Sequence, residues 1–256
     1  MKNNWVRERI RSGKPTIGCF MGLGSPNVAE LLAHAGFDWL VIETEHNGLD
    51  SAEVEHMLMA VNTTPTIPLV RIPSAQQTFI QRALDLGGMG IVVPMVRTAQ
   101  EARQIVAATR YPPQGTRSFG GLRASHYTFD NEDYFNRAND QIIIMLIIET
   151  KEAAENLEEI AAVPGVDILF LGTMDLCLSL GLNPLRQPYP EISAILQKAL
   201  EIRQRTGVTV GIGVTTPEQV RQRQAEGHHC LIYSGDYQML AGAAQSGLAA
   251  FQRGPA

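Results

Sequence analysis

Two carboxylates near the middle of the chain follow strongly apolar runs. Glu149 comes directly after IIIMLII, and Asp175 lies shortly after VDILFLG. Runs of this length, rich in Ile, Val and Leu and lacking alternation, are typical of strands buried on both faces of a parallel sheet. The segment between them, KEAAENLEEIAAV, has apolar residues at helical spacing. The pattern therefore predicts a strand, helix, strand unit with one acid at the end of each strand.

Acids at the carboxyl ends of neighbouring parallel strands meet at the same edge of a sheet and can share one divalent cation. Two oxygen ligands without Cys or clustered His favour Mg²⁺, Mn²⁺ or Co²⁺. Most coordination positions would stay open, which suits a cation that grips a 2-oxo acid by its carboxylate and carbonyl oxygens. The alternative interpretation is that both acids only cap the helices that follow them.

Other polar residues fall at predicted strand ends. Glu43, Glu45 and His46 follow one strand, and Arg71 lies within the apolar segment IPLVRI. An unpaired charge buried in such a strand is costly, so Arg71 either pairs with an acid or receives an anionic oxygen. A neutral His46 could accept a proton near pH 7, and an exposed loop histidine without chemistry is the alternative.

Segments with a strand pattern alternate with segments with a helix pattern along the chain, and this order predicts the fold. Apolar strands are expected at 16–23, 39–45, 67–72, 89–95, 142–148, 166–172, 209–214 and 230–234, each followed by a helical pattern. Eight such pairs without a linker predict one (β/α)8 TIM barrel over residues 1–256, with an active site at the carboxyl ends of the strands. A short helix at 3–11 could plug the opposite end. A doubly wound open sheet is the alternative, but GLGSPN is a poor nucleotide-binding turn.

Three local details complete this prediction. Ser51 and Ser74 are expected to cap the helices after the second and third strands, the latter continuing to Gly88. Residues 111–140 are expected to be irregular, and loops of this length are functional or contact other subunits. The three cysteines, Cys19, Cys177 and Cys230, show no ligand spacing and are expected to be reduced thiols.

Composition excludes several classes of protein. A net charge of −5 gives no basic surface for nucleic acid. No apolar run approaches the roughly 18 residues that span a bilayer, and the N-terminus lacks the apolar core of a signal peptide, so a cytoplasmic protein without a membrane partner is expected. None of the four lysines lies within a predicted strand, which disfavours a Schiff-base mechanism. The last two strand ends lack a glycine-rich phosphate turn, which disfavours a phosphorylated substrate.

Several segments together resemble the HpcH/HpaI family of metal-dependent (class II) pyruvate aldolases, over nearly the whole chain. They are FDWLVIETEH, LVRI, GGMGIVVPMV, ATRYPPQGTRSFG, IIET and GVDILFLGTMDLCLSLG. The resemblance implies a (β/α)8 barrel whose last helix is exchanged between subunits, usually of a hexamer. It further implies the site: Glu149 and Asp175 as metal ligands, Arg71 on the 2-oxo oxygen, His46 in the base system with Asp85 of a neighbouring subunit, and the amides of Gly172, Thr173, Met174 and Asp175 around the pyruvate carboxylate.

Three segments depart from the pattern common in that family. This chain has IETEH, IIET and GTMDLC where the family has IDGEH, QIET and GPADLS. Ile147 therefore replaces a polar glutamine beside the substrate, and Met174 adds bulk next to the carboxylate-binding amides. These changes bear on substrate preference and on the fate of the carbanion.

The leading functional prediction is a carbon–carbon lyase that cleaves a 4-hydroxy-2-oxo acid to pyruvate and an aldehyde through a metal-stabilised enolate. One alternative uses the same enolate for synthesis, by citrate-forming or decarboxylating condensation. The other is a non-catalytic 2-oxo acid binder. All three require small-molecule 2-oxo acid partners.

The sequence also predicts a shared active site in a homo-oligomer. The final helix, YQMLAGAAQSGLAAF, is rich in small residues that allow close helix packing. The loop bearing Arg117 and Arg123 is expected to extend beyond its own barrel, and Asp85 lies at the end of a helix, away from its own strand ends. Arg123 is expected to hold the anionic or polar tail of the aldehyde portion in a neighbouring site.

Overall fold

The computed structural model describes residues 1–251 and contains a closed barrel of eight parallel strands in the order β1 to β8. Parallel pairing runs around the whole ring, from Gly18 opposite Trp39 to Thr16 opposite Cys230. The strands are β1 Thr16–Met21, β2 Trp39–Glu43, β3 Ile67–Arg71, β4 Gly90–Val93, β5 Ile143–Ile148, β6 Ile168–Leu171, β7 Thr209–Val214 and β8 Cys230–Gly235. The predicted fold class is confirmed.

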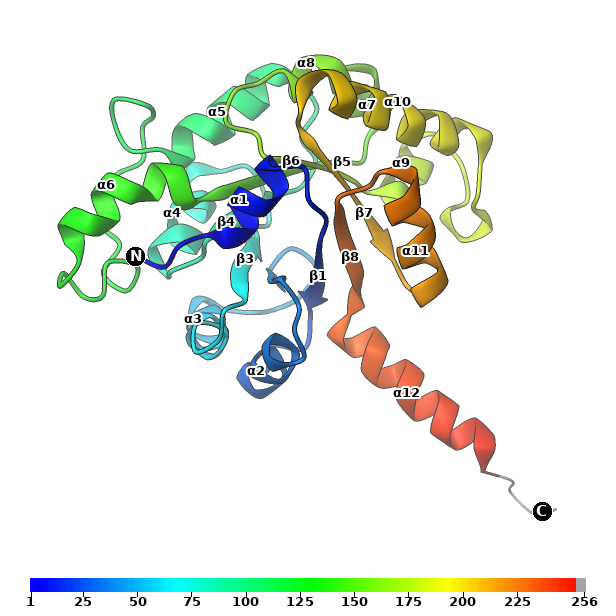
Figure 1. Ribbon diagram of the computed structural model, residues 1–256, viewed down its shortest axis with the longest axis horizontal. Coiled ribbons are helices and arrows are strands. Elements are labelled where there is room, and N and C mark those ends of the chain that lie inside the picture. Colours follow the sequence, from blue (N-terminus) through cyan, green and yellow to red (C-terminus); the bar gives the residue numbers. More distant parts are fainter. Residues whose placement is uncertain (252–256) are drawn as a thin grey trace.

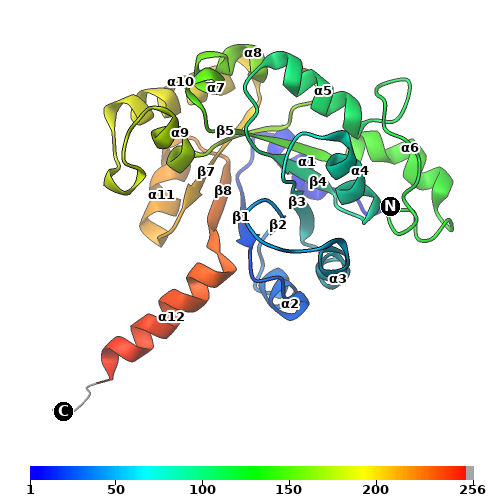
Figure 2. The same cartoon turned by 180° about the vertical axis from the view of Figure 1, so that it is seen from behind.

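Helices connect successive strands and form an outer layer, as Figures 1 and 2 show from opposite sides. Their bounds are α1 Trp5–Arg11, α2 Pro26–His34, α3 Ser51–Val61, α4 Gln77–Asp85, α5 Ala99–Thr109, α6 Asn131–Gln141, α7 Lys151–Glu155, α8 Leu157–Ala161, α9 Thr173–Ser179, the 3-10 turn η1 Pro184–Arg186, α10 Pro190–Thr206, α11 Pro217–Glu226 and α12 Asp236–Ala250.

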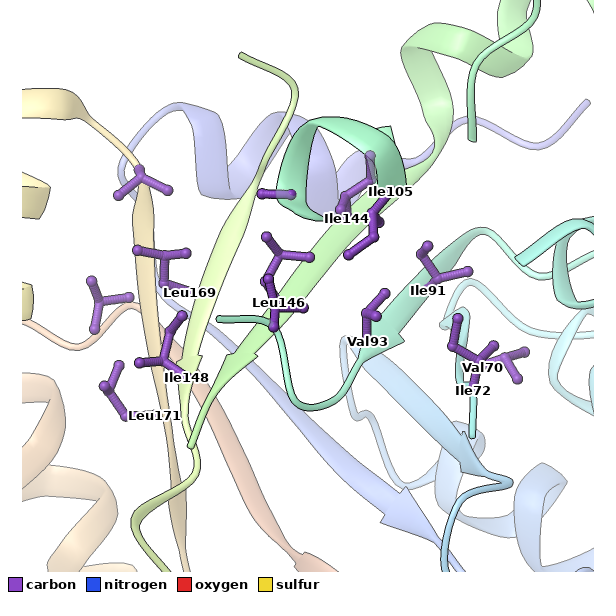
Figure 3. Close-up of a cluster of buried hydrophobic side chains, with 14 of the residues drawn as sticks. Val70, Ile72, Ile91, Val93, Ile105, Ile144, Leu146, Ile148, Leu169 and Leu171 are labelled. Carbon is purple, nitrogen blue, oxygen red and sulfur yellow. The ribbon is translucent and has the colours of Figure 1, made fainter. Parts of the chain in front are cut away.

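Each strand buries both of its faces, which explains the lack of alternation in the sequence. One set of side chains points outward and packs under the helices, as Figure 3 shows for Val70, Val93, Ile144, Leu146 and Leu169. The other set fills the barrel interior in a second cluster that includes Trp39, Leu69, Met145 and Ile232. Strand positions are therefore fixed from inside and outside, and the residues at the strand ends inherit that rigidity.

The N-terminal helix α1 closes the amino ends of the strands. Its apolar side chains Val6 and Ile10 belong to the interior cluster. Arg7, also buried, donates from Nε to Asp167 Oδ1 over 3.1 Å. Burial of an ion pair is costly unless it is well bonded, so this contact fixes the orientation of α1. The predicted plug is present, and it leaves the carboxyl ends as the open end of the barrel.

Helix α12 does not pack along the barrel wall. It extends away from the body of the molecule in both views (Figures 1 and 2). From Leu240 to Phe251 every residue is exposed, including Leu248 and Phe251. Its root is held by Asp236, whose carboxylate accepts hydrogen bonds from the backbone N–H groups of Gly22 and Leu23 over 2.8 and 3.1 Å.

Several local predictions were wrong. Asp50 rather than Ser51 caps α3, in a reciprocal capping box with Glu53. A carboxylate one residue earlier can accept from two backbone amides, so it displaces the serine. Helix α4 begins at Gln77 without a side-chain cap from Ser74 and ends at Asp85. The helix expected between β5 and β6 is broken at Asn156 into α7 and α8.

The predicted irregular stretch 111–140 was also wrong in part, because α6 occupies Asn131–Gln141. The helix is mostly polar and buries Tyr134 and Ala138, so its apolar stripe is too thin to stand out in the sequence. Within residues 1–251 no helix is long and apolar enough to cross a membrane.

Candidate active site at the carboxyl ends of the strands

A cavity of about 830 Å³ opens at the carboxyl ends of the strands, which we call the rim. Seven of the nine predicted site residues line it, together with the neighbouring acid Glu43: His46, Arg71, Glu149, Gly172, Thr173, Met174 and Asp175. They come from β2, β3, β5 and β6 and the segments after them. Their placement on one rim follows from parallel strands that all end at the same side of the barrel.

Glu149 is the most enclosed acid of this set, with 3% of its surface exposed. The backbone N–H of Met95, just after β4, donates to its Oε1 over 2.6 Å. Met95 has a φ of 57°, a region that non-glycine residues rarely occupy. Burial raises the pKa of Glu149, and the nearby carboxylates of Asp175 and Glu45 raise it further. A cation beside Glu149 would relieve that repulsion.

Asp175 lies in the first turn of α9 and, unlike Glu149, is exposed. Both carboxylates line the main cavity and also a second opening of about 650 Å³ beside Met95. No cluster of three or more metal-binding side chains is found among residues 1–251. A pair of oxygen donors fits a divalent cation that keeps most of its positions for water and ligand.

Arg71, the last residue of β3, is held between acids. Its Nη1 lies 3.1 Å from Glu43 Oε2, and its Nη2 lies 2.5 Å from Glu45 Oε2. The same Nη2 is 4.0 Å from Glu149 Oε2. The buried Arg71 Nε has no hydrogen-bond partner in the described chain. Of the two roles predicted, pairing with acids is present, and the free N–H leaves a donor for an anionic oxygen.

His46 stands at the edge of the cavity, with 64% of its side chain exposed. Its Nε2 is 3.5 Å from Glu45 Oε2, and its backbone N–H donates to Glu43 Oε1 over 3.3 Å. Burial raises the pKa of Glu45, and the Arg71 guanidinium opposes that effect. The imidazole is therefore next to a carboxylate and open to the cavity, an arrangement that permits proton transfer.

The family model described as HpcH/HpaI aldolase/citrate lyase matches residues 16–235, from β1 to the end of β8. The chain belongs to this family. A 2-dehydro-3,6-dideoxy-6-sulfogluconate aldolase of Pseudomonas putida is 39% identical, over 92% of each chain. A hydroxypyruvate/pyruvate aldolase of Deinococcus radiodurans is 39% identical, over 98% of this chain and 90% of the relative.

A solved structure agrees with that assignment. A HpcH/HpaI aldolase/citrate lyase family protein from Burkholderia cenocepacia has a TM-score of 0.91 and 34% identity, covering 96% of this chain and 98% of that one. A citrate synthase structure has a TM-score of 0.84 and 28% identity, covering 95% of this chain and 96% of that one. The HpcH/HpaI fold thus carries both kinds of named enzyme.

Two of the predicted site residues lie outside the rim cavity: Asp85, implied by the family resemblance, and Arg123, predicted from the long loop. Asp85 and Arg123 line a separate cavity of about 520 Å³ beside α4. Arg123 donates from Nη1 to the Leu86 carbonyl oxygen over 2.7 Å, and its Nε is 3.9 Å from Glu55 Oε1. Asp85 ends α4, as expected. Within one chain, neither residue joins the acids of the rim.

The expectation that the loop bearing Arg117 extends beyond its own barrel was wrong for that residue. The Arg117 side chain is fully enclosed and donates from Nη2 to Asp85 Oδ1 over 2.8 Å and to the Tyr134 hydroxyl over 2.9 Å. Its guanidinium also lies 4.6 Å from the centre of the Tyr111 ring. Charge pairing and ring stacking hold this part of the loop against α4 and α6.

Two residues from the three segments that depart from the HpcH/HpaI pattern, Ile147 and Met174, lie in the rim cavity. Ile147, near the end of β5, is almost fully buried and packs in the interior cluster. Met174 is half exposed, and its sulfur is 3.4 Å from Gln187 Nε2. The first departure makes the floor of the cavity apolar, and the second places a flexible side chain at its edge.

Sequence reasoning missed two contributors. Met95 acts through its backbone N–H, and no side-chain signal marks such a contact. Phe20, in β1, lines the cavity with its ring centre 5.7 Å from the Arg71 guanidinium, and it meets Phe170 edge to face. An aromatic residue near the end of a barrel strand was the available signal for Phe20. The three cysteines are buried and unpaired, as expected.

Proposed function

We propose that this protein is a divalent-metal-dependent aldolase that cleaves a 4-hydroxy-2-oxo acid to pyruvate and an aldehyde. The observation that carries the proposal is the convergence of Glu149, Asp175, Arg71 and His46 on one rim cavity. Aldolase is also the activity named for both relatives described above. The reaction breaks the bond between C3 and C4 and leaves its electron pair on C3.

Glu149 and Asp175 are proposed to hold the cation. Their oxygen donors, the hydrogen bond that fixes one carboxylate and the two openings beside them support this assignment. A divalent ion bound there supplies Lewis acidity to the carboxylate and carbonyl oxygens of a 2-oxo acid. Mg²⁺, Mn²⁺ and Co²⁺ all accept such ligands, and metal-binding measurements decide which of the three ions this site prefers.

Arg71 is proposed to stabilise the oxygen that gains negative charge as the enolate forms. Glu43 and Glu45 fix the guanidinium on two sides and leave Nε–H without a protein partner. A donor held in place before reaction stabilises developing charge without reorganisation. The main-chain N–H groups from Gly172 to Asp175, at the start of α9, are proposed to bind the carboxylate of pyruvate.

His46 is proposed to remove the proton of the 4-hydroxyl group, directly or through water. The C4 carbon then becomes the aldehyde carbon, and C3 later takes a proton to complete pyruvate. His46 is suited to this step because its ring is exposed to the cavity and lies beside Glu45. Asp85 of a neighbouring subunit is proposed to complete the base system, as the family resemblance implies.

Assembly is part of the same proposal. We propose a homo-oligomer, a hexamer by resemblance, in which α12 is exchanged between subunits and Arg123 reaches a neighbouring site. The exposed apolar side chains of α12, Leu240, Leu248 and Phe251, support a partner for this helix. The chain is proposed to act as one catalytic domain over residues 1–256, and its cytoplasmic location stays a prediction.

A condensation reaction through the same enolate is the second candidate. Two observations support this condensation reaction: the likeness to a solved citrate synthase, and the apolar Ile147 on the cavity floor. Screening pyruvate and oxaloacetate against aldehydes and acyl donors separates the two directions. A non-catalytic 2-oxo acid binder remains the third, and it predicts binding without proton exchange.

Proton exchange at C3 of pyruvate tests the proposal. We expect deuterium incorporation from D₂O, measured by mass spectrometry, that requires Mg²⁺ and stops in a chelator. Glu149→Ala and Asp175→Ala should each abolish exchange and divalent-ion binding by calorimetry together. Glu159→Ala, which removes an exposed acid from α8, is the matched control and should exchange normally. Full exchange by wild type in chelator would overturn the metal mechanism.

A further inference from the structure

The rim cavity has two chemically different halves. The half formed by β2, β3, β5 and β6 carries the charged residues Glu43, Arg71, Glu149 and Asp175. The other half is formed by β7, β8 and β1, which lie together on the far side of the closed ring. The polar side chains of this second half are neutral near the strand ends: Thr215, Gln219, Ser234 and Gln238.

Two glutamines in the neutral half are held in the same way. The Thr215 N–H donates to Gln219 Oε1 over 2.8 Å, and the Thr215 hydroxyl donates to the same oxygen over 3.1 Å. The Ser234 hydroxyl donates to Gln238 Oε1 over 3.0 Å. Because each amide oxygen is occupied by a residue four positions earlier, each amide NH₂ group is left to donate to a ligand.

Ser234 adds a conformational observation. Its φ is 58°, which lies in the left-handed part of backbone conformational space. Met95, beside Glu149, is a second non-glycine residue with such a φ. Such backbone conformations cost energy and concentrate at functional sites. Here the conformation sets the end of β8, where the hydroxyl of Ser234 meets Gln238.

The cations of the cavity are already engaged. Besides His46, the described residues give it two cationic side chains, Arg71 and Arg223. Arg71 is held by Glu43 and Glu45, and Arg223 donates to Glu226 Oε2 over 2.8 Å. Glu43, Glu45 and Glu149 lie within 4.0 Å of the Arg71 guanidinium, and Asp175 lines the same cavity, so a divalent ion still leaves no excess positive charge. Among the residues of one chain, a distal anionic group would therefore meet repulsion without a free cation. Arg123, proposed to reach the site from a neighbouring subunit, bonds to the Leu86 carbonyl oxygen and faces Glu55 within its own chain, so we assign it to a polar rather than an anionic tail.

The cavity is large enough for both parts of a substrate. Its volume of about 830 Å³ lies in the range of sites for ligands well beyond the size of pyruvate. The charged half suits the 2-oxo acid portion, and His46, after β2, lies where the charged half adjoins β1. The aldehyde portion is then directed toward the neutral half.

From these contacts we infer that the aldehyde released or accepted here is a neutral hydroxyaldehyde. The inference rests on the proposed aldolase function. Hydroxyl groups on the carbons beyond the aldehyde match the NH₂ donors of Gln219 and Gln238, while the hydroxyls of Thr215 and Ser234 can also accept. A dicarboxylic semialdehyde or a sulfonated aldehyde places a negative charge in this half without an opposing charge from the same chain.

Condensation with pyruvate and Mg²⁺ tests this inference with three aldehydes. Glyceraldehyde is neutral and hydroxylated, propionaldehyde is neutral and apolar, and succinic semialdehyde is anionic. We expect kcat/KM for glyceraldehyde to exceed both others by about tenfold or more, the scale of one or two hydrogen bonds. The double variant Gln219→Ala, Gln238→Ala should lower the ratio of glyceraldehyde to propionaldehyde toward one. Gln197→Ala, on the exposed face of α10, is the matched control and should keep the ratio.

The ratio of kcat/KM values is the readout because loss of metal binding or folding lowers all three reactions together. Succinic semialdehyde as the best acceptor would overturn the inference. If Arg123→Ala then lost the preference for succinic semialdehyde, Arg123 of another subunit would be the residue that binds its carboxylate. Absence of pyruvate proton exchange in wild type would instead reject the proposed aldolase function. If the double variant exchanged the protons of pyruvate and kept the wild-type ratio of kcat/KM for glyceraldehyde over propionaldehyde, only the proposed role of the two glutamines would be rejected.

Discussion

The backbone N–H of Met95 and the carboxylate of Glu149 are joined by a hydrogen bond of 2.6 Å. It links the end of β4 to the end of β5 and fixes which oxygen of Glu149 faces the protein. The other oxygen, Oε2, is directed to the side where Arg71 Nη2 lies 4.0 Å away. The carboxylate is therefore oriented before any ligand binds, at the cost of an unusual backbone conformation at Met95.

Gly172 controls the space next to that carboxylate. A Cβ at this position would lie 2.9 Å from Glu149 Cβ and 3.0 Å from both Glu149 Oε2 and Ile147 Cγ2. We expect Gly172→Ala to displace Glu149 and to weaken divalent-ion binding about tenfold or more, on the scale of changes in groups that orient metal ligands. Calorimetric titration with Mn²⁺ measures the effect.

Gly48→Ala is the control for this prediction, because a Cβ there meets open space and its φ is ordinary. It should bind the ion as wild type does. Equal affinity in Gly172→Ala and wild type would show that Glu149 can shift freely or does not bind the ion.

Arg71 is expected to act mainly in the transition state. Arg71→Lys keeps one positive charge but cannot span Glu43 and Glu45 while offering a further N–H, because it lacks the planar fork. We expect kcat for cleavage to fall by about 10², the scale of one lost oxyanion donor. Steady-state kinetics give kcat and KM separately. A raised KM with unchanged kcat would limit Arg71 to substrate binding.

His228 makes stability depend on pH. It is fully enclosed, neither ring nitrogen has a hydrogen-bond partner in the described chain, and burial lowers its pKa to about 4. The folded protein therefore keeps the ring neutral, while the unfolded chain binds a proton below its ordinary value near 6.5. The contribution to stability is complete above that pH and is lost as pH falls toward 4.

The size of this loss is about 2–3 kcal/mol between pH 7 and 4 for this one group. Urea unfolding at several pH values measures it. His228→Gln should lose less stability over that interval than wild type, whatever its stability at pH 7. His34→Gln, which changes an exposed helix-terminal histidine, serves as the control and should follow wild type. A parallel pH dependence in His228→Gln and wild type would exclude His228 as the source.

The proposed assembly predicts that substitution of Arg123 affects substrate cleavage and pyruvate proton exchange differently. If Arg123 serves a neighbouring site, Arg123→Ala should weaken cleavage of the 4-hydroxy-2-oxo acid and spare proton exchange of pyruvate. The reason is that pyruvate is proposed to contact only the charged half of the cavity. Kinetic assays of both reactions and sedimentation velocity provide the measurements. An active monomer would refute the shared site, and equal loss of both activities would remove the specific role of Arg123.

The sequence by itself determined the barrel and most of the rim. Strands enclosed on both faces need continuous apolar runs, and parallel strands all end at one side, so Glu149, Asp175, Arg71 and His46 could be grouped from their positions after such runs. These features depend on periodicity and chain direction, which a sequence displays directly.

Tertiary structure decided the rest. The Met95 N–H that holds Glu149 is a backbone group, so no residue type announces it. Arg117 and Asp85 pair across a sequence separation of 32 because the loop folds back on α4, and α6 forms on a stripe of two buried residues. The pairing of Arg71 with Glu43 and Glu45, rather than with one acid, follows from the register of β2 against β3. Such contacts depend on which side chains the closed ring brings within bonding distance, and sequence spacing alone does not contain that information.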